Sequence, residues 1–250
     1  MTGTWRALVL AVLAALSLQL FFLGRIALMA RVDPHSTTFQ RSEAWRLVTT
    51  RPGPLRWRQE WQPYDRIADN LKRAVIASED GSFTVHEGVD WEALEKAWER
   101  NAQAEQRAAR QRPRPAARAQ LAPQGKPPKI VGGSTITQQL AKNLLLSGER
   151  TLLRKGQEMV LTFALEAMLT KERILEIYLN SVEWGEGVFG AEAAARHYYR
   201  KSAAQLSAYE AARLAVMLPR PKYFEKLPNS GYLASRASTI VARMHGAELP

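Results

Sequence analysis

The sequence predicts a mainly α-helical protein, and three observations carry that prediction. Apolar residues recur at helical spacing from residue 67 onward, no run alternates as a sheet strand would, and glycines and prolines separate the periodic segments. The 250 residues are 46% apolar, which suffices for a buried core and excludes global disorder. The absence of cysteine excludes a disulfide framework, a thiolate zinc site and a cysteine nucleophile.

The first 30 residues predict a single transmembrane anchor. From Ala7 to Leu23 there are 17 residues without a charge, and as a helix they span roughly 25 Å, slightly less than a bilayer core. Residues 26–30 lengthen the span when Arg25 extends to the lipid headgroups. A cleaved signal peptide is the alternative. Arg25 and Arg31 outnumber Arg6, so the positive-inside rule favours a cytoplasmic C-terminal flank.

Residues 31–64 predict a connector with short extended pieces, because prolines and a glycine interrupt them. A helical domain is expected over residues 65–250. Ile67, Leu71 and Val75 lie on one helical face, and a further helix is expected to begin near Trp91.

The net charge of +11 is unevenly distributed. Residues 99–129 hold 8 basic and 2 acidic residues, a net of +6, and Leu121 is their only large aliphatic residue. Such a segment buries too little apolar surface to offset the entropy of ordering, so we predict a mobile basic loop over residues 101–129. Nucleic-acid binding is disfavoured because stacking aromatics are absent from it; an anionic membrane surface suits its charge.

The first candidate motif is the run from Glu79 to Gly88. Glu79 and Asp80 follow the apolar run Ala74–Ala77, so a carboxylate lies at the edge of a hydrophobic element. Partial desolvation there raises a carboxyl pKa and suits a general base. A helix end with solvated acids, and an ordinary structural His86, is the alternative.

The second motif, Gly132–Asn143, predicts a helix that begins after Thr135. Thr135 and Gln138 have the spacing of a capping box. Free N–H groups, the helix dipole and the small hydroxyls of this run are typical of an anion site. Simple helix capping is the alternative.

The third motif places four cations around one acid. Lys142, Arg150, Arg154 and Lys155 precede or flank Glu158. Glu158 then leads into the apolar run 159–165, which predicts a helix buried on all sides. An ordinary surface pair of Arg154 with Glu158 is the alternative. The four histidines are scattered, and no metal motif is visible.

The fourth motif, residues 171–180, predicts a helix with hydrogen-bonding groups at Glu176, Tyr178 and Asn180. Together the four motifs resemble, in order and spacing, the monofunctional biosynthetic peptidoglycan transglycosylases, single-domain relatives of class A penicillin-binding proteins. The family runs are Glu-Asp-x-x-Phe-x-x-His-x-Gly, Gly-Gly-Ser-Thr-Ile-Thr-Gln-Gln, Arg-Lys-x-x-Glu and Ile-Leu-Glu-x-Tyr-Leu-Asn, and they begin here at residues 79, 132, 154 and 174.

The resemblance implies a lysozyme-like, two-lobed glycosyltransferase domain that polymerises lipid II into β-1,4 glycan strands with inversion and releases undecaprenyl diphosphate. Glu79 matches the general base and Glu158 the second carboxylate. The substrate-binding residues implied are Asp80, Ser134, Thr135, Thr137, Gln138, Gln139, Lys142, Arg150, Arg154 and Lys155. The structural supports are Phe83, His86, Glu176, Tyr178 and Asn180.

The resemblance also implies a single-pass protein of the inner membrane, with its catalytic domain on the outer face, that serves cell-wall synthesis and cell shape. This orientation opposes the charge bias around the anchor. No cofactor is required, and a divalent cation at the diphosphate is left open. The partners implied are lipid II, the growing strand, the membrane and penicillin-binding transpeptidases, with no nucleic acid.

Two departures from the family pattern stand out. The 101–129 segment is longer and more basic than usual, and Gly81 replaces a larger polar residue. No Ser-x-x-Lys transpeptidase follows the domain, so cross-linking is expected from another protein. A lytic lysozyme-like enzyme and an inactive membrane-tethered scaffold are the alternative functions.

Overall fold

The computed structural model describes residues 3–50, 53–54, 56–110, 133–146, 148 and 151–250. The chain forms two compact units, residues 1–88 with 135–250 and residues 89–134. The described residues are mainly helical, which confirms the predicted fold class. The helices of the first unit are α1 (Gly3–Met29), α2 (Thr38–Thr50), α3 (Asp69–Glu79), α5 (Ile136–Leu145), α6 (Leu152–Met168), α7 (Lys171–Ser181), α8 (Ala191–Tyr199), α9 (Ala208–Met217), α10 (Pro221–Phe224) and α11 (Gly231–Met244), with 3₁₀ turns η1 (Tyr64–Arg66) and η2 (Ala203–Gln205).

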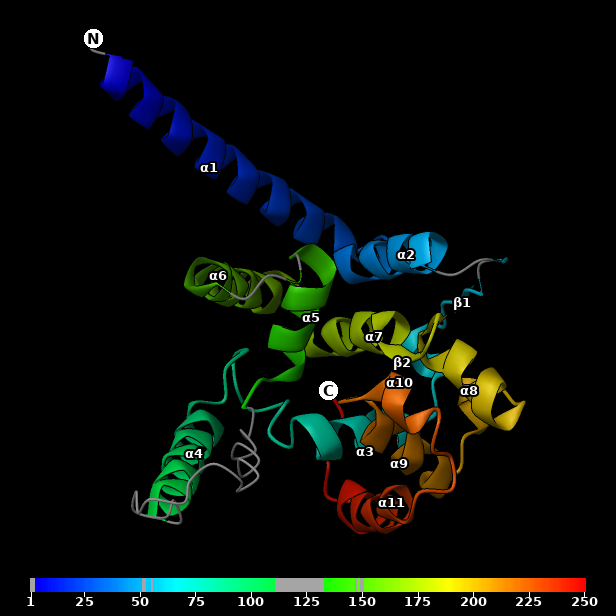
Figure 1. Cartoon of the computed structure of the whole chain (residues 1–250). Helices are drawn as coiled ribbons and strands as arrows, with labels where there is room; N and C mark the ends of the chain where they lie inside the picture. The colour runs from blue at the N-terminus through cyan, green and yellow to red at the C-terminus, as the bar shows by residue number, and fades with distance from the viewer. Residues whose placement is uncertain (1–2, 51–52, 55, 111–132, 147, 149–150) are drawn as a thin grey trace. The chain divides into compact units, whose positions relative to one another are not determined.

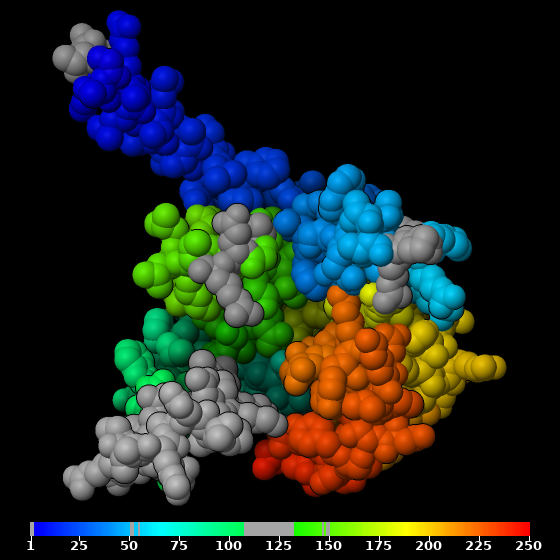
Figure 2. Space-filling model, viewed as in Figure 1, coloured from blue at the N-terminus to red at the C-terminus, as the bar shows by residue number. Residues whose placement is uncertain are grey.

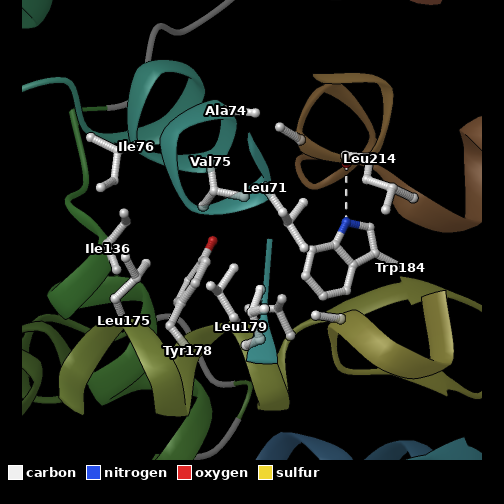
Figure 3. Packing of buried hydrophobic residues seen from close by; sticks show 14 of the residues in the cluster. Leu71, Ala74, Val75, Ile76, Ile136, Leu175, Tyr178, Leu179, Trp184 and Leu214 are labelled. Atoms are coloured by element: carbon white, nitrogen blue, oxygen red, sulfur yellow. Dashed lines mark hydrogen bonds between the residues drawn. The ribbon is translucent and has the colours of Figure 1, made fainter. Parts of the chain in front are cut away.

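The core of the first unit forms where α7 faces α3. Tyr178 and Leu179 of α7 point toward Leu71 and Val75 of α3, and all four side chains are buried (Figure 3). Helix α9 packs on α3 and α11, while α5 packs on α6, α7 and α2 (Figure 1). Leu71 and Val75 of the predicted apolar face therefore point into the core, where burial of large aliphatic side chains is the main stabilising term. Ile67 is buried too, but its backbone is extended and it precedes α3, which corrects its expected place on the helix.

A small sheet lies beside α8, and the sequence pattern predicts neither its strand pairing nor its two strands outside the connector. It has three strands in the order β1 (Arg58–Gln59), β3 (Val188–Phe189), β2 (Glu183–Gly185); β1 runs parallel to β3, and β2 runs antiparallel to it with an irregular register. The strands have two or three residues each, too few to produce a visible alternation. Gly187 has φ +71°, and a Cβ there would lie 2.0 Å from the carbonyl oxygen of Arg56, so glycine is required.

The predicted connector over residues 31–64 contains one short extended piece, β1, as expected, but it also contains a helix, which the prediction lacked. Helix α2 occupies residues 38–50 and buries Gln40 and Leu47. The hydroxyl of Thr38 donates to the carbonyl of Leu144 over 2.9 Å, and the Gln40 amide donates to the carbonyl of Ser181 over 3.3 Å. Tertiary hydrogen bonds to α5 and α7 thus hold a helix whose own apolar periodicity is weak.

The second unit contains α4 (Trp91–Arg110), whose start near Trp91 confirms the prediction. The predicted loop at residues 101–129 is wrong for its first ten residues, because α4 continues through them. Alanine, glutamine and arginine in this stretch are good helix formers, so helix propensity outweighs the scarcity of apolar residues. The remainder of the predicted loop, residues 111–129, lies outside the described residues.

Helix α6 is buried on one face only, so the expectation of burial on all sides is wrong. Glu158, Leu161, Thr162 and Leu165 are buried, but Val160 is 53% exposed. The exposed apolar side chains of the helix are Leu152, Leu153, Val160, Phe163 and Met168. An apolar face that no described residue covers is typical of contact with a membrane or another protein.

Helix α1 is a 27-residue apolar element that is long enough to cross a membrane. Its most apolar window has a mean hydropathy of 2.4 and is only 6% buried. Figure 2 shows it standing clear of other described side chains over most of its length. Near its middle, the side-chain amides of Gln19 and Gln157 exchange two hydrogen bonds, of 2.6 and 3.0 Å, which join α1 to α6.

Candidate active site

Glu79 is the last residue of α3, and its carboxylate is half-buried. Burial raises its pKa above the usual range, and the neighbouring charge of Asp80 raises it further. Hydrogen bonds from Gln139 and Ser78 favour the ionised form and oppose part of that effect. The result is a carboxylate at the edge of the core whose proton affinity is higher than that of an exposed glutamate, as a general base requires.

Gln139 and Tyr178 hold Glu79 in place. Gln139 Nε2 donates to Oε2 of Glu79 over 3.0 Å, and the hydroxyl of Tyr178 donates to Oε1 of Gln139 over 3.0 Å. Because Tyr178 occupies the amide oxygen, the amide nitrogen of Gln139 faces the carboxylate. The Tyr178 ring is buried in the core, where its pKa is raised well above the usual value by burial and by the charges of Glu79 and Asp80. It therefore stays a proton donor.

Asp80 binds the beginning of α5. Its Oδ2 accepts the backbone N–H of Ile136 over 2.9 Å, and its Oδ1 lies 2.8 Å from Nε2 of His86. The capping box is confirmed: the Thr135 hydroxyl accepts the N–H of Gln138, and the Gln138 side chain accepts the N–H of Thr135. A carboxylate of the chain itself thus occupies the helix N-terminus, where the sequence predicts a substrate anion.

Three residues of the second motif are engaged within the protein. Thr135, Thr137 and Gln138 are each 5% exposed or less. The hydroxyl of Thr135 donates to the carbonyl of Gly88 over 2.6 Å, and that of Thr137 donates to Oε1 of Glu166 over 2.6 Å. Their polar atoms hold the site in shape, and the geometry gives no support to the expectation that these three bind substrate directly. Ser134 is exposed in the other unit.

Glu166 and Lys171 belong to the site although sequence reasoning missed them. Lys171 Nζ donates to Glu166 over 2.9 Å and to the carbonyl of His86 over 2.6 Å, and it lies 4.7 Å from the centre of the Phe83 ring. Phe83 is fully buried, which agrees with its expected structural role. The available signal is an acid five residues before a lysine. That spacing differs from the i,i+3 and i,i+4 pairs that face each other on one helix, so the pattern does not predict the contact.

Gly88 lets α6 approach the loop that follows Glu79. Its φ is +86°, and a Cβ there would lie 2.7 Å from Cγ2 of Thr162 and 2.9 Å from Cγ of Glu166. Both the backbone conformation and the space require glycine. The loop is therefore clamped between α5, through Thr135, and α6.

Glu158 forms a second group with two cations on the first turns of α6. Its carboxylate is 5% exposed and accepts from Nη1 of Arg154 over 3.0 Å and from Nζ of Lys155. Lys155 keeps 48% of its side chain exposed, and Nε of Arg154 is buried without a hydrogen-bond partner among the described residues. Lys142 is exposed on α5, and Arg150 lies outside the described residues. No hydrogen bond or ion pair between described residues joins Glu158 directly to Glu79.

Glu176 and Asn180 attach the segment before α3 to α7. The Asn180 side chain exchanges hydrogen bonds with the backbone of Gln62, both of 2.8 Å, and Glu176 accepts from the indole of Trp61 over 3.3 Å. These contacts fit the structural roles expected of both residues. Within the described ranges, no group of three acids or histidines could hold a metal ion.

Comparisons with known proteins match the part of the chain that contains the candidate site. A family model described as Transglycosylase matches residues 48–110 and 113–245. A protein of Burkholderia thailandensis is 52% identical over 238 residues, which cover 95% of this chain and 84% of the relative. Proteins of Burkholderia orbicola and Burkholderia lata are each 51% identical over 237 residues, 95% of this chain and 87% of theirs. All three relatives are named biosynthetic peptidoglycan transglycosylase.

Proposed function

The chain belongs to the transglycosylase family, and on that premise we propose how its residues polymerise glycan. It is a peptidoglycan glycosyltransferase, as the family and its relatives' names indicate. The substrates proposed are lipid II and the growing glycan strand. The alternative of a lytic enzyme is not favoured, because the relatives carry the word biosynthetic in their names.

Glu79 is the proposed general base. It takes the proton from the acceptor's 4-hydroxyl as that oxygen bonds to the donor's anomeric carbon. The bond from this carbon to the diphosphate oxygen breaks, and undecaprenyl diphosphate leaves from the opposite face, which gives a β-1,4 link with inversion. The single observation that carries this assignment is the half-buried Glu79 carboxylate, whose pKa burial raises and which Gln139 orients at 3.0 Å.

Arg154 and Lys155, with Lys142 and Arg150, are proposed to stabilise the leaving diphosphate. Positive charge and N–H donors lower the energy of the developing anion. Glu158 serves in this proposal as the positioning residue for Arg154 and Lys155, to which it bonds. Because protein cations fill this role, we propose no resident metal. A divalent cation would bind the diphosphate alongside these side chains.

Helix α1 is proposed as the membrane anchor, in the inner membrane, with the catalytic domain on the outer face. Its length and mean hydropathy of 2.4 support a membrane span. A location beside the lipid-linked donor supports the outer-face orientation. Cross-linking of the product by penicillin-binding transpeptidases completes the proposal.

The experiment uses the full chain in detergent with purified lipid II in one reaction and finished glycan strands in another. Products are separated by gel electrophoresis and by mass spectrometry. The proposal expects long glycan strands and free undecaprenyl diphosphate from lipid II, and no change in the finished strands. Cleavage of the finished strands without polymerisation of lipid II would overturn it.

A further inference from the structure

A cavity of about 220 Å³ lies where α1 ends and the chain turns into α2. Its apolar wall consists of Leu28, Met29 and Val32, and its polar wall includes Arg25 and Arg41. No residue of the Glu79 or Glu158 group lines it. The cavity is thus a separate site, and the proposed catalytic mechanism assigns it no role.

Two arginines, Arg25 and Arg41, line this cavity, and no acid among the described residues forms an ion pair with either. Arg41 donates to the carbonyl and hydroxyl of Ser36 and to the hydroxyl of Thr38, at 3.0–3.2 Å, and all three acceptors are uncharged. Arg25 stacks 5.8 Å above the Phe21 ring. Among the described residues, neither arginine has an ion-pair partner.

Asp33, the one acid that lines the cavity, is already paired. Its Oδ1 lies 2.7 Å from Nη2 of Arg173, which comes from α7, and Nε of the same arginine donates to the carbonyl of Met29 over 2.8 Å. Arg173 also pairs with Glu176 of α7, whose Oε2 lies 2.9 Å from its Nη1, so it bridges the two acids and fixes the turn between α1 and α2. Arg25 and Arg41 still outweigh the acids of this group. The charge left in the cavity is positive, which suits an anion bound by two forked donors.

The cavity lies at the boundary between apolar and polar sequence. Only Gly24 separates Arg25 from the uncharged run that ends at Leu23. On α2, Trp45 and Val48 follow Arg41 at helical spacing and are 72% and 61% exposed. An exposed tryptophan on the same helix face as an arginine is typical of the membrane–water interface. An anion bound here would therefore lie at headgroup depth.

We propose that this cavity binds the phosphate of an anionic membrane phospholipid, with Arg25 and Arg41 on the phosphate and Leu28, Met29 and Val32 along the first acyl carbons. The inference rests on the proposed membrane anchoring by α1. We assign the site to a phospholipid and not to free phosphate, because free phosphate would make no contact with the apolar wall. A bound lipid would fasten the turn that Arg173 connects to α7, the helix that also carries Tyr178.

The test measures lipid retained by the full chain. The chain in neutral detergent is titrated with dioleoyl phosphatidylglycerol or dioleoyl phosphatidylcholine, and native mass spectrometry counts bound lipids. The double variant Arg25→Gln/Arg41→Gln is compared with Arg6→Gln/Arg31→Gln, which removes the same charge from α1 and from the turn after it, at residues that do not line the cavity. Circular dichroism checks that all three chains are folded.

The expected result is one phosphatidylglycerol, preferred about tenfold over phosphatidylcholine, in the unsubstituted chain and the control, and loss of that preference in the cavity variant. Equal loss in both variants would overturn the proposal in favour of diffuse charge attraction. Displacement of the lipid by millimolar glycerol 3-phosphate would show that the cavity binds a soluble phosphate ester equally well, and it would overturn the assignment to a membrane lipid. Polymerisation is measured separately on the same samples, so failure of the proposed enzymatic function is distinguished from failure of the lipid site.

Discussion

The amide nitrogen of Gln139 lies 3.0 Å from Oε2 of Glu79 and donates a hydrogen bond to it. This bond joins the start of α5 to the end of α3, the two segments that hold the first and second sequence motifs. Its direction is set by Tyr178, whose hydroxyl occupies the other end of the amide. A buried tyrosine thereby influences the proton affinity of a carboxylate that it does not touch.

Tyr178→Phe tests that relationship. Without the hydroxyl, the Gln139 amide is free to turn, and the ionised form of Glu79 loses a donor. The pKa of Glu79 is already raised by burial, so it rises further, and the acidic limb of the pH–activity profile moves to higher pH by up to about one unit. The pH dependence of kcat/KM measures this shift. Tyr223→Phe, at a half-exposed ring, is the control. An unchanged profile in Tyr178→Phe would show that Tyr178 does not influence the pKa of Glu79.

Gly88→Ala tests the clamp on the loop after Glu79. The added Cβ meets Thr162 and Glu166 at 2.7 and 2.9 Å, on a backbone with φ +86°. We expect a loss of about 2 kcal/mol or more in the free energy of unfolding, measured by denaturant titration. Gly81→Ala, in the same loop with open space around it, should cost less than about 0.5 kcal/mol. Equal effects of the two substitutions would contradict the described packing.

Lys155→Gln tests the cations of α6. The substitution removes one charge from the proposed diphosphate site and leaves Arg154 on Glu158. We expect kcat and kcat/KM for lipid II to fall together by at least about tenfold, because the missing contact strengthens in the transition state. Lys226→Gln, an exposed lysine on another segment, makes the same charge change. If KM rises alone, Lys155 binds the ground state and does not assist departure of the diphosphate.

Glu183→Gln tests a buried acid outside the catalytic groups. Burial, with a smaller contribution from Glu43, raises the pKa of Glu183 to about 7, although Lys222 lies 3.1 Å away. The folded protein holds this proton more tightly than the unfolded chain, so the native chain loses stability as the pH rises from about 4.5 to about 7.

Glutamine does not titrate, so the stability of Glu183→Gln relative to the unsubstituted chain should increase across that range by about 3 kcal/mol. Denaturant titrations at several pH values measure the difference. The exposed Glu248 supplies the control, Glu248→Gln. A difference that is constant with pH would show that Glu183 is already ionised below pH 5.

The sequence predicts those parts of the molecule whose signal is local. Thr135 and Gln138 carry a capping box in their own spacing, and Glu79 follows its apolar run directly. Helix α2 has no comparable signal, because hydrogen bonds from Thr38 and Gln40 to distant carbonyls hold it. The same reason hides Glu166, whose partner Thr137 lies 29 residues away in the chain.

The one-sided burial of α6 was also beyond sequence reasoning. Val160 and Phe163 are apolar like Leu161 and Leu165, yet the first two are exposed and the second two buried. Periodicity distinguishes apolar from polar faces, but it does not distinguish an apolar face that meets the core from one that meets a membrane or partner. The packing of α6 against α5 in the structure shows which apolar face meets the core.

The rate at which Glu79→Gln polymerises lipid II decides whether Glu79 is the general base. Because glutamine cannot take the acceptor's proton, we expect kcat to fall by about 10²- to 10⁴-fold or more, with the chain still folded by circular dichroism and thermal unfolding. Glu87→Gln, an exposed acid in the same loop, should keep its activity. Polymerisation by Glu79→Gln at the rate of the unsubstituted chain would contradict the assignment of Glu79 as the base.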